Sequence, residues 1–188
     1  MFPRPDFFTG ARLNFAENLL FPTNSDVDPD SAAVLSVSES DSRAVSTSWR
    51  ELREDVRRCS SGLRAAGVKE KDVVAGFISN HVEAVVAMLA TAALGAIWTS
   101  ISPDNGVSAV LDRLVQVKPK ILFADNGMIY NGKVWPSAAK SLQIVDTLTK
   151  HGLEGVVIVE ALKSLDLGLG DLEGKGVRAD EYQAFLQR

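Results

Sequence analysis

Cysteine and histidine are scarce in this sequence, which has one cysteine and two histidines among its 188 residues. Cys59 has no second cysteine with which to form an internal disulfide, so a reducing compartment, the cytoplasm, is the expected location. His81 and His151 lie far apart, and neither has a cysteine or a second histidine at ligand spacing. We therefore expect no metal site built from these residues.

Long apolar runs and an excess of positive charge are also absent. The most apolar stretch, residues 84–98, is interrupted by Thr91 and Gly95 and is shorter than the ~20 residues of a membrane-spanning helix. The N-terminus has no basic leader followed by an apolar run, so we expect neither a secretory signal nor a membrane partner. The formal net charge is −4, which argues against a nucleic-acid partner.

Several motifs of nucleotide and acyl chemistry are missing. The sequence has no GxxxxGK[ST] phosphate loop, no GxGxxG after a predicted strand and no GxSxG nucleophile turn. Residues 168–176 are rich in glycine, but Asp171 and Glu173 would repel a phosphate there. Composition and motifs alone therefore identify no catalytic group.

A regular alternation of strand and helix patterns is present instead. Short apolar stretches predict strands at 73–79, 96–101, 121–124 and 155–159. Between them, apolar residues recur every three or four positions in helices that begin at Ser48, His81, Val107 and Pro136 and end at Gly67, Gly95, Pro119 and Gly152. The alternation predicts an α/β fold with a mostly parallel sheet flanked by helices.

The first long helix has the clearest signals. Ser48 and Glu51 have the spacing of a capping box. Cys59 lies on the apolar stripe of this helix, so we interpret it as a core residue and not a nucleophile. In the next helix, Asn80 together with Glu83 is expected to cap the N-terminus.

The chain divides into three parts. Residues 1–30 form an arm rich in phenylalanine and proline, with a helix over 12–20, whose aromatic side chains are expected to pack onto a larger body. Residues 31–160 form the α/β subdomain. Residues 161–188 are expected to be a linker with a short terminal helix.

The two ends of the subdomain carry further expectations. Its first strands, 32–37 and 43–47, are joined by the turn 39–42. Its sheet is expected to end at the strand 155–159, followed by a loose acidic tail. An exposed sheet edge would then favour self-association.

Ligands of open parallel sheets bind where the strands end at their carboxyl edge. Three segments qualify here, namely 79–81, 99–106 and 125–133. The third contains two Asn-Gly pairs, which predict turns, and Lys133, which is either a phosphate contact or a solvated lysine. His81 is either an acid–base group or, as we favour, a residue that satisfies the start of its helix.

Six segments in order along the chain resemble a known family. They are FTGARLNFAENLL (8–20), STSWREL (46–52), LRAAGVKEKDVVA (63–75), ATAALGAIWTSISPD (90–104), GVSAVLDRLVQVKPKILF (106–123) and YNGK (130–133). The series resembles the adenylate-forming acyl-CoA synthetases, and among them the acetoacetyl-CoA synthetases most. The resemblance extends over about residues 8–160.

The resemblance implies an acid–thiol ligase. Such enzymes use ATP and Mg²⁺ to convert a carboxylate into an acyl-adenylate with release of pyrophosphate, and coenzyme A then displaces AMP. The family's phosphate loop, its adenine and ribose contacts and its C-terminal catalytic lysine are not in this sequence. The resemblance therefore implies an N-terminal portion with no catalytic residue, no cofactor of its own and no acyl-CoA formation when alone.

The resemblance also places two segments near coenzyme A. They are the loop with Ser102 and Pro103 and the turn Asn131, Gly132 and Lys133. The sequence departs from the acetyl-CoA enzymes in both, since Pro103-Asp104 replaces a glycine pair and Lys133 stands where arginines occur. Two alternatives remain open: a portion of a ligase for another short acid, and a truncated, non-catalytic binding or regulatory module.

Overall fold

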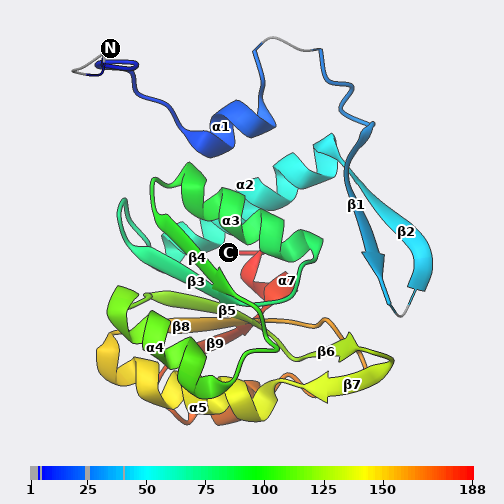
Figure 1. Cartoon of the computed structure of the whole chain (residues 1–188), viewed down its shortest axis with the longest axis vertical. Coiled ribbons are helices and arrows are strands. Elements are labelled where there is room, and N and C mark those ends of the chain that lie inside the picture. The colour runs from blue at the N-terminus through cyan, green and yellow to red at the C-terminus, as the bar shows by residue number, and fades with distance from the viewer. Residues whose placement is uncertain (1–3, 5, 24–25, 40) are drawn as a thin grey trace.

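A five-stranded sheet forms the centre of the molecule in a computed structural model that describes residues 4, 6–23, 26–39 and 41–188 (Figure 1). Its strands are β3 (Val73–Phe77), β4 (Ile97–Ile101), β5 (Ile121–Asp125), β8 (Gly155–Val159) and β9 (Arg178–Glu181). They are all parallel and lie in the order β4-β3-β5-β8-β9. The predicted α/β fold with a parallel sheet is therefore confirmed.

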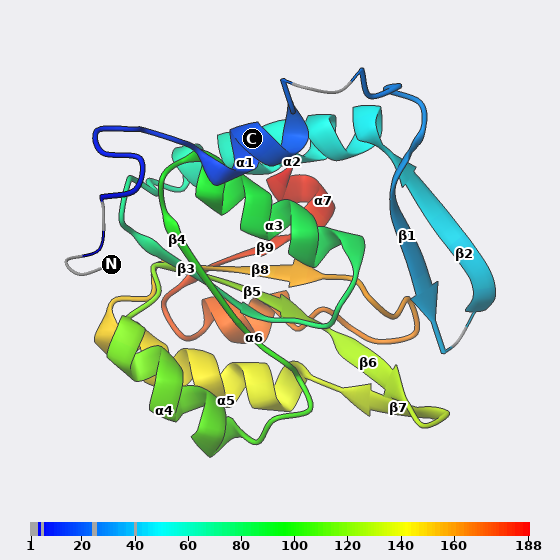
Figure 2. The same cartoon turned by 45° about the horizontal axis from the view of Figure 1, so that its top comes forward.

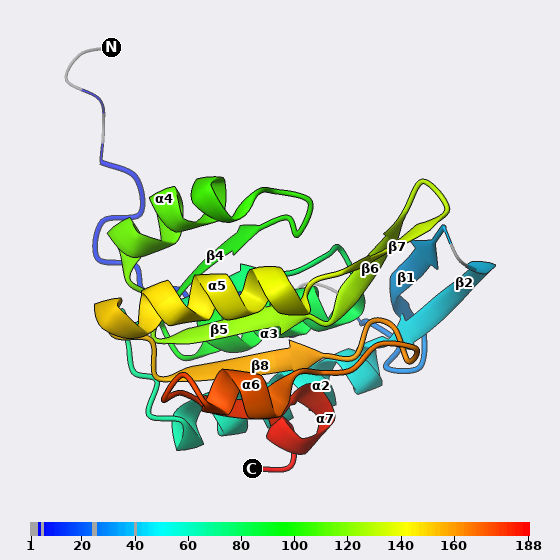
Figure 3. The same cartoon turned by 90° about the horizontal axis from the view of Figure 1, so that it is seen from below.

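Helices cover both faces of the sheet because successive strand residues point to opposite sides. Val74 and Phe123 belong to the core under α1 (Phe15–Leu20), α2 (Trp49–Ala65), α3 (Val82–Ala93) and α7 (Tyr182–Phe185). Ala75 and Leu122 belong to the core under α4 (Val107–Val117), α5 (Ala138–Leu148) and α6 (Leu169–Glu173). Figure 3 views the sheet from this second side.

Helix α2 forms as predicted. Ser48 accepts a hydrogen bond from the Glu51 N–H, and Glu51 Oε2 accepts one from the Ser48 N–H, so the capping box is complete. Cys59 is fully buried on the apolar stripe. Gly67 follows the helix with a φ of +83°, a conformation that glycine adopts without steric cost.

Two antiparallel hairpins project beside the carboxyl edge of the sheet (Figure 2). One consists of β1 (Ala32–Ser38) and β2 (Asp41–Ser48), and Ser40 of its predicted turn lies outside the described residues. The other consists of β6 (Gly127–Tyr130) and β7 (Lys133–Pro136). We predicted a loop here, whereas the structure has a hairpin with a single Asn-Gly turn at its tip.

The C-terminal part also differs from the expected linker. Residues 161–188 contain α6, the fifth parallel strand β9 and α7. Strand β9 pairs with β8, and Tyr182 and Phe185 of α7 are buried in the core. The loose tail was therefore a wrong prediction, and the sheet continues past β8.

The N-terminal arm makes fewer aromatic contacts than predicted. Its helix begins at Phe15 instead of residue 12, because Asn14 acts as the N-cap. Ala16 and Leu20 are buried against the body, whereas Phe7 and Phe8 are 78% and 80% exposed. The arm therefore docks through its helix, while Phe2 and Pro3 lie outside the described residues.

The helix after β7 differs in one respect from its predicted apolar stripe. α5 begins at Ala138, continues into a 3₁₀ turn at Thr149–His151 and ends at Gly152. The apolar spacing of this segment predicts an inward face formed by Ala139, Leu142, Val145 and Leu148. Val145 and Leu148 are fully buried, as is Ile144, whereas Ala139 is exposed. The predicted inward face is therefore confirmed at Val145 and Leu148 and wrong at Ala139.

Candidate functional site at the carboxyl edge of the sheet

The three predicted strand-end segments all lie at the carboxyl edge, because β3, β4 and β5 are adjacent and parallel. The segment after β3 contributes Ser79 and His81, and the end of β5 contributes Asp125. The segments after β4 and β5 contribute Ser102–Gly106 and the β6–β7 hairpin. The predicted location is thus shared, although the contacts within it differ from those expected.

His81 lies between two carboxylates. Its Nε2 is 2.8 Å from Asp125 Oδ1 and its Nδ1 is 2.8 Å from Glu83 Oε2. The first contact is a hydrogen bond, and the second is an ion pair without hydrogen-bond alignment. The Asp125 side chain is fully buried, with 0% exposure, and its Oδ2 accepts a 2.7 Å hydrogen bond from the Ser79 N–H.

The environment of His81 shifts its pKa in two opposing directions. Burial lowers the pKa, but the interactions with Asp125 and Glu83 outweigh burial and raise it to about 9. For Glu83, burial raises the pKa, and the contact with His81 more than compensates, so the pKa is lowered. At neutral pH the cluster therefore contains an imidazolium between two carboxylates.

This arrangement corrects the expectation for the start of α3. His81 occupies the N-cap position, and its side chain makes no capping hydrogen bond. Asn80, predicted as the cap, precedes that position. Sequence reasoning missed the His81–Asp125 pair, although the positions of both residues at neighbouring strand ends were a usable signal.

Asn126 is buried directly after Asp125. Its Nδ2 donates to Leu162 O at 2.8 Å and to Leu165 O at 3.1 Å, and its Oδ1 accepts from the Leu162 N–H at 3.0 Å. The turn predicted at Asn126-Gly127 therefore does not form. The Asn126 amide instead holds the segment that follows β8.

The loop after β4 is held by α5. Lys140 Nζ donates to Pro103 O at 3.0 Å and to Asn105 O at 3.2 Å. Pro103 is buried, whereas Ser102 and Asp104 are exposed. The exposed part of this loop therefore presents a hydroxyl and a carboxylate to solvent.

The predicted turn Asn131-Gly132-Lys133 is the exposed tip of the second hairpin. Asn131 and Gly132 have φ values of +51° and +68°, as a two-residue hairpin turn requires. The Gly132 N–H donates to Glu39 Oε2 of the first hairpin at 3.3 Å. Across the described residues, neither a hydrogen bond nor an ion pair joins this tip to the Ser102–Gly106 loop.

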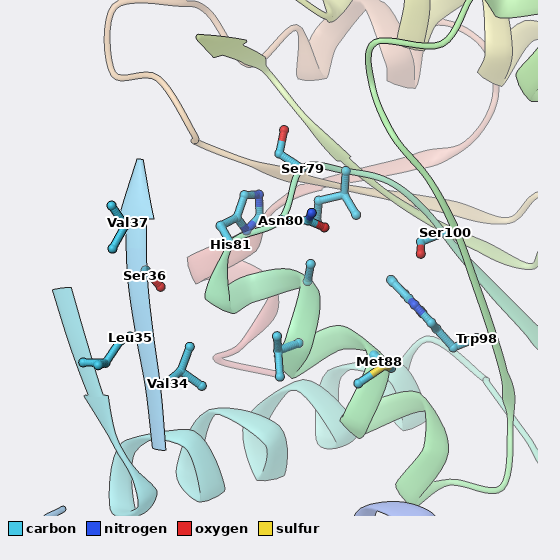
Figure 4. A pocket seen from close by; sticks show the side chains of 13 residues that line it. Val34, Leu35, Ser36, Val37, Ser79, Asn80, His81, Met88, Trp98 and Ser100 are labelled. Carbon is cyan, nitrogen blue, oxygen red and sulfur yellow. The ribbon is translucent and has the colours of Figure 1, made fainter. Parts of the chain in front are cut away.

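A pocket of about 520 Å³ lies next to His81, between β1, the start of α3 and β4. Figure 4 shows Ser79, Asn80 and His81 on one side of it and Trp98 and Ser100 of β4 on another. Apolar side chains form much of its wall, namely Val34, Leu35, Val37, Ile78, Ala84, Val85 and Met88. No pattern in the sequence indicates this pocket, since it depends on the placement of the β1–β2 hairpin.

The described part of the chain contains neither a membrane-spanning helix nor a side-chain cluster suited to a metal ion. None of its helices is long and apolar enough to cross a membrane. No group of three or more His, Cys, Asp or Glu residues among residues 4, 6–23, 26–39 and 41–188 could hold a metal ion.

Comparison with known proteins gives a consistent set of matches. Residues 21–178 match a family model described as "AMP-binding enzyme". A malonamoyl-CoA synthetase of Penicillium aethiopicum is 48% identical over 187 residues, which are 99% of this chain and 25% of that protein. An acetoacetyl-CoA synthetase of Danio rerio is 41% identical over 160 residues, 85% of this chain and 23% of that protein.

A solved structure agrees with these matches. An acetoacetyl-CoA synthetase from Streptomyces lividans superposes with a TM-score of 0.79 and 32% sequence identity, over 94% of this chain and 25% of that chain. The chain thus spans about a quarter of the length of the relatives that it matches.

Proposed function

Since the chain belongs to the AMP-binding enzyme family, we propose that it forms the N-terminal part of an AMP-forming ligase that joins acetoacetate to coenzyme A. The observation that carries the proposal is the identity of 41% to an acetoacetyl-CoA synthetase over 85% of the chain. The complete ligase would use ATP, Mg²⁺ and coenzyme A, all of them soluble, and would act in the cytoplasm.

The proposed reaction has two steps. The acid carboxylate attacks the α-phosphorus of ATP, and pyrophosphate leaves. The thiolate of coenzyme A then attacks the acyl carbon, and AMP leaves with the electron pair of the broken C–O bond. Mg²⁺ neutralises phosphate charge in such reactions. The described residues contain no group of three or more His, Cys, Asp or Glu that could hold the ion, and no step through the metal is assigned to this chain.

We assign this chain a share of the coenzyme A surface. Ser102 and Pro103 in the loop after β4 and the turn Asn131, Gly132 and Lys133 are the proposed contacts. A lysine ammonium suits a phosphate, whereas the Gly132 N–H at the turn already donates to Glu39. Asp104 opposes that charge, which favours Lys133 as the main phosphate contact.

Malonamate is the second candidate acid. The malonamoyl-CoA synthetase is 48% identical over 99% of the chain, a higher value than the acetoacetyl-CoA synthetase gives. Acetoacetate and malonamate both have a carbonyl group two carbons from the carboxylate carbon. They differ in the group attached to that carbonyl, which is a methyl group in acetoacetate and an amino group in malonamate. The proposed substrate class is therefore a short acid with a carbonyl at its third carbon.

Self-association is a further proposal. Strand β4 is an edge strand of the sheet, and its residues Ile97–Ile101 carry no charge, so a second copy could pair with it. The other edge strand, β9, carries Arg178, Asp180 and Glu181. Light scattering of the chain should detect a concentration-dependent dimer, and a strictly monomeric chain would contradict this proposal.

Release of AMP and pyrophosphate tests the main proposal. The isolated chain, supplied with ATP, Mg²⁺, coenzyme A and acetoacetate, should release neither product. A chimera in which the chain replaces the matching quarter of the Streptomyces lividans enzyme should turn over acetoacetate and malonamate in preference to acetate and propionate. Turnover by the isolated chain, or an inactive but folded chimera, would contradict the proposal.

A further inference from the structure

The cluster Glu83–His81–Asp125 joins segments that are distant in sequence. His81 and Glu83 lie at the start of α3, and Asp125 is the last residue of β5. Asp125 uses both carboxylate oxygens, one for His81 Nε2 and one for the Ser79 N–H. Within the described residues, His81 is the one side chain that forms an ion pair with Asp125, so its charge decides whether the buried carboxylate is neutralised.

The two neighbouring carboxylates favour a proton on both ring nitrogens of His81. A neutral imidazole has one N–H and one nitrogen lone pair. Since both nitrogens lie 2.8 Å from a carboxylate oxygen, the neutral form would leave one unprotonated nitrogen beside a negative charge. The imidazolium forms the hydrogen bond to Asp125 and the ion pair with Glu83, and loss of its charge leaves Asp125 buried without a countercharge.

Asp125 is followed by the residue that holds both ends of the β6–β7 hairpin. The Asn126 N–H donates to Val159 O at 3.1 Å, directly before β6 begins. Asn126 O accepts from the Ser137 N–H at 3.0 Å, directly after β7 ends. The placement of the hairpin on the sheet therefore depends on the segment 125–126.

We propose that His81 is a positioning residue, whose imidazolium fixes Asp125 and thereby holds the β6–β7 hairpin, with Lys133 at its tip, in the orientation that coenzyme A binding needs. This inference rests on the proposed function for its ligand, but not for the effect of the His81–Asp125 contact on the hairpin. It assigns His81 a structural effect on ligand binding and no contact with the reacting atoms.

The charges around His81 come from several elements. Glu83 of α3 and Asp125 of β5 face it directly. Asp55 of α2 and Tyr182 of α7 interact with Glu83 at longer range. His81 is the cation between the carboxylates of Glu83 and Asp125. Its protonation state therefore sets the net charge of the three side chains.

Peptide-resolved hydrogen exchange of the chain tests the inference. In His81→Gln, amides of residues 127–136 should lose protection by about tenfold, while amides of β8 keep theirs. His151→Gln, the change at the other histidine, is the matched control and should leave the hairpin unchanged. Unchanged exchange at 127–136 in His81→Gln, or an equal loss over the whole chain, would overturn the inference.

The unmodified chain provides a second test, which also covers a variant that fails to fold. As the pH rises through about 9, the pKa of His81, protection of the hairpin should fall relative to that of β8 after correction for intrinsic exchange rates. A constant ratio would overturn the inference. Nitrogen NMR should show protons on both His81 ring nitrogens at neutral pH, and a neutral ring would overturn it as well.

Kinetics of the chimera separate this inference from the proposed function. His81→Gln should raise the KM for coenzyme A several-fold more than the KM for ATP. A loosened hairpin with an unchanged KM for coenzyme A would support positioning by His81 and contradict the coenzyme A contact. An ordered hairpin with a raised KM would contradict positioning.

Discussion

Gly62 of α2 and Phe185 of α7 lie in direct contact, since a Cβ at position 62 would be 2.7 Å from Phe185 Cε1 and 2.8 Å from Phe185 O. The Phe185 ring in turn meets Phe123 of β5 edge to face, with centroids 5.9 Å apart. This contact fixes the C-terminal helix against the central strand. A residue without a side chain is therefore required in the last turn of α2.

Gly62→Ala should destabilise the chain by about 1–3 kcal/mol, because the added methyl group overlaps Phe185. The loss should appear although alanine favours a helix by about 1 kcal/mol over glycine. Gly170→Ala in α6 is the control, because nothing lies within 4 Å of its Cβ. Urea unfolding measures both, and a stabilised Gly62→Ala would show that α7 does not dock on α2.

Ser48→Ala should cost about 1 kcal/mol of unfolding free energy, because it removes the hydrogen bond to the Glu51 N–H and one half of the capping box. Ser137→Ala is the comparison, since Ser137 is the N-cap of α5 and makes no side-chain capping bond. The midpoint of thermal unfolding should fall more in Ser48→Ala than in Ser137→Ala. Equal losses would contradict the assigned cap.

Stability should depend on pH through His81. Its folded pKa of about 9 lies above the unfolded value of about 6.5, so its contribution is fully present below about pH 6.5 and is lost as the pH rises through 9. The shift corresponds to about 3 kcal/mol at most. As the pH rises from 6 to 10, the urea concentration at the midpoint of unfolding should fall in the unmodified chain. In His81→Gln this midpoint should change less with pH.

Cys59 should resist thiol reagents in the folded chain. Burial raises the pKa of its thiol to about 12, and the side chain is fully buried, so neither thiolate nor access is available. Labelling with iodoacetamide at pH 8 should be slow and should accelerate in urea. Rapid labelling without denaturant would contradict the core position of Cys59.

Lys133→Ala in the chimera should raise the KM for coenzyme A by about fivefold and change the KM for ATP little. Lys69→Ala is the control. Lys69 is also exposed to solvent, but it precedes β3, at the opposite edge of the sheet. An equal KM for coenzyme A in both variants would make Lys133 a solvated lysine. Stability should not change in either, since both side chains are exposed.

Much of the fold could be predicted from local patterns. Strand β8 and helix α2 follow apolar periodicity that is visible in the sequence, and Gly67 ends α2 for a steric reason that needs no tertiary structure. Strand β9 could not be predicted, because Arg178–Glu181 is short and polar, and its pairing with β8 alone makes it a strand.

The same limit applies to the site. The carboxyl edge was predicted because parallel strands end together. The pairing of His81 with Asp125 was not, since it requires the register that places Val74 beside Ile121. The turn predicted at Asn126 was wrong because the amide of this residue bonds to a distant segment instead of its own backbone.

The burial of α7 sets an order of events during synthesis of the chain. Leu52 and Leu63 of α2 share a core with Tyr182, Phe185 and Leu186, yet α2 leaves the ribosome long before these residues do. The apolar face of α2 therefore stays partly uncovered on the nascent chain, where it is open to chaperones and to aggregation. Contacts of such large sequence separation also slow folding, and the core over α2 is not complete until the residues of α7 have been synthesised.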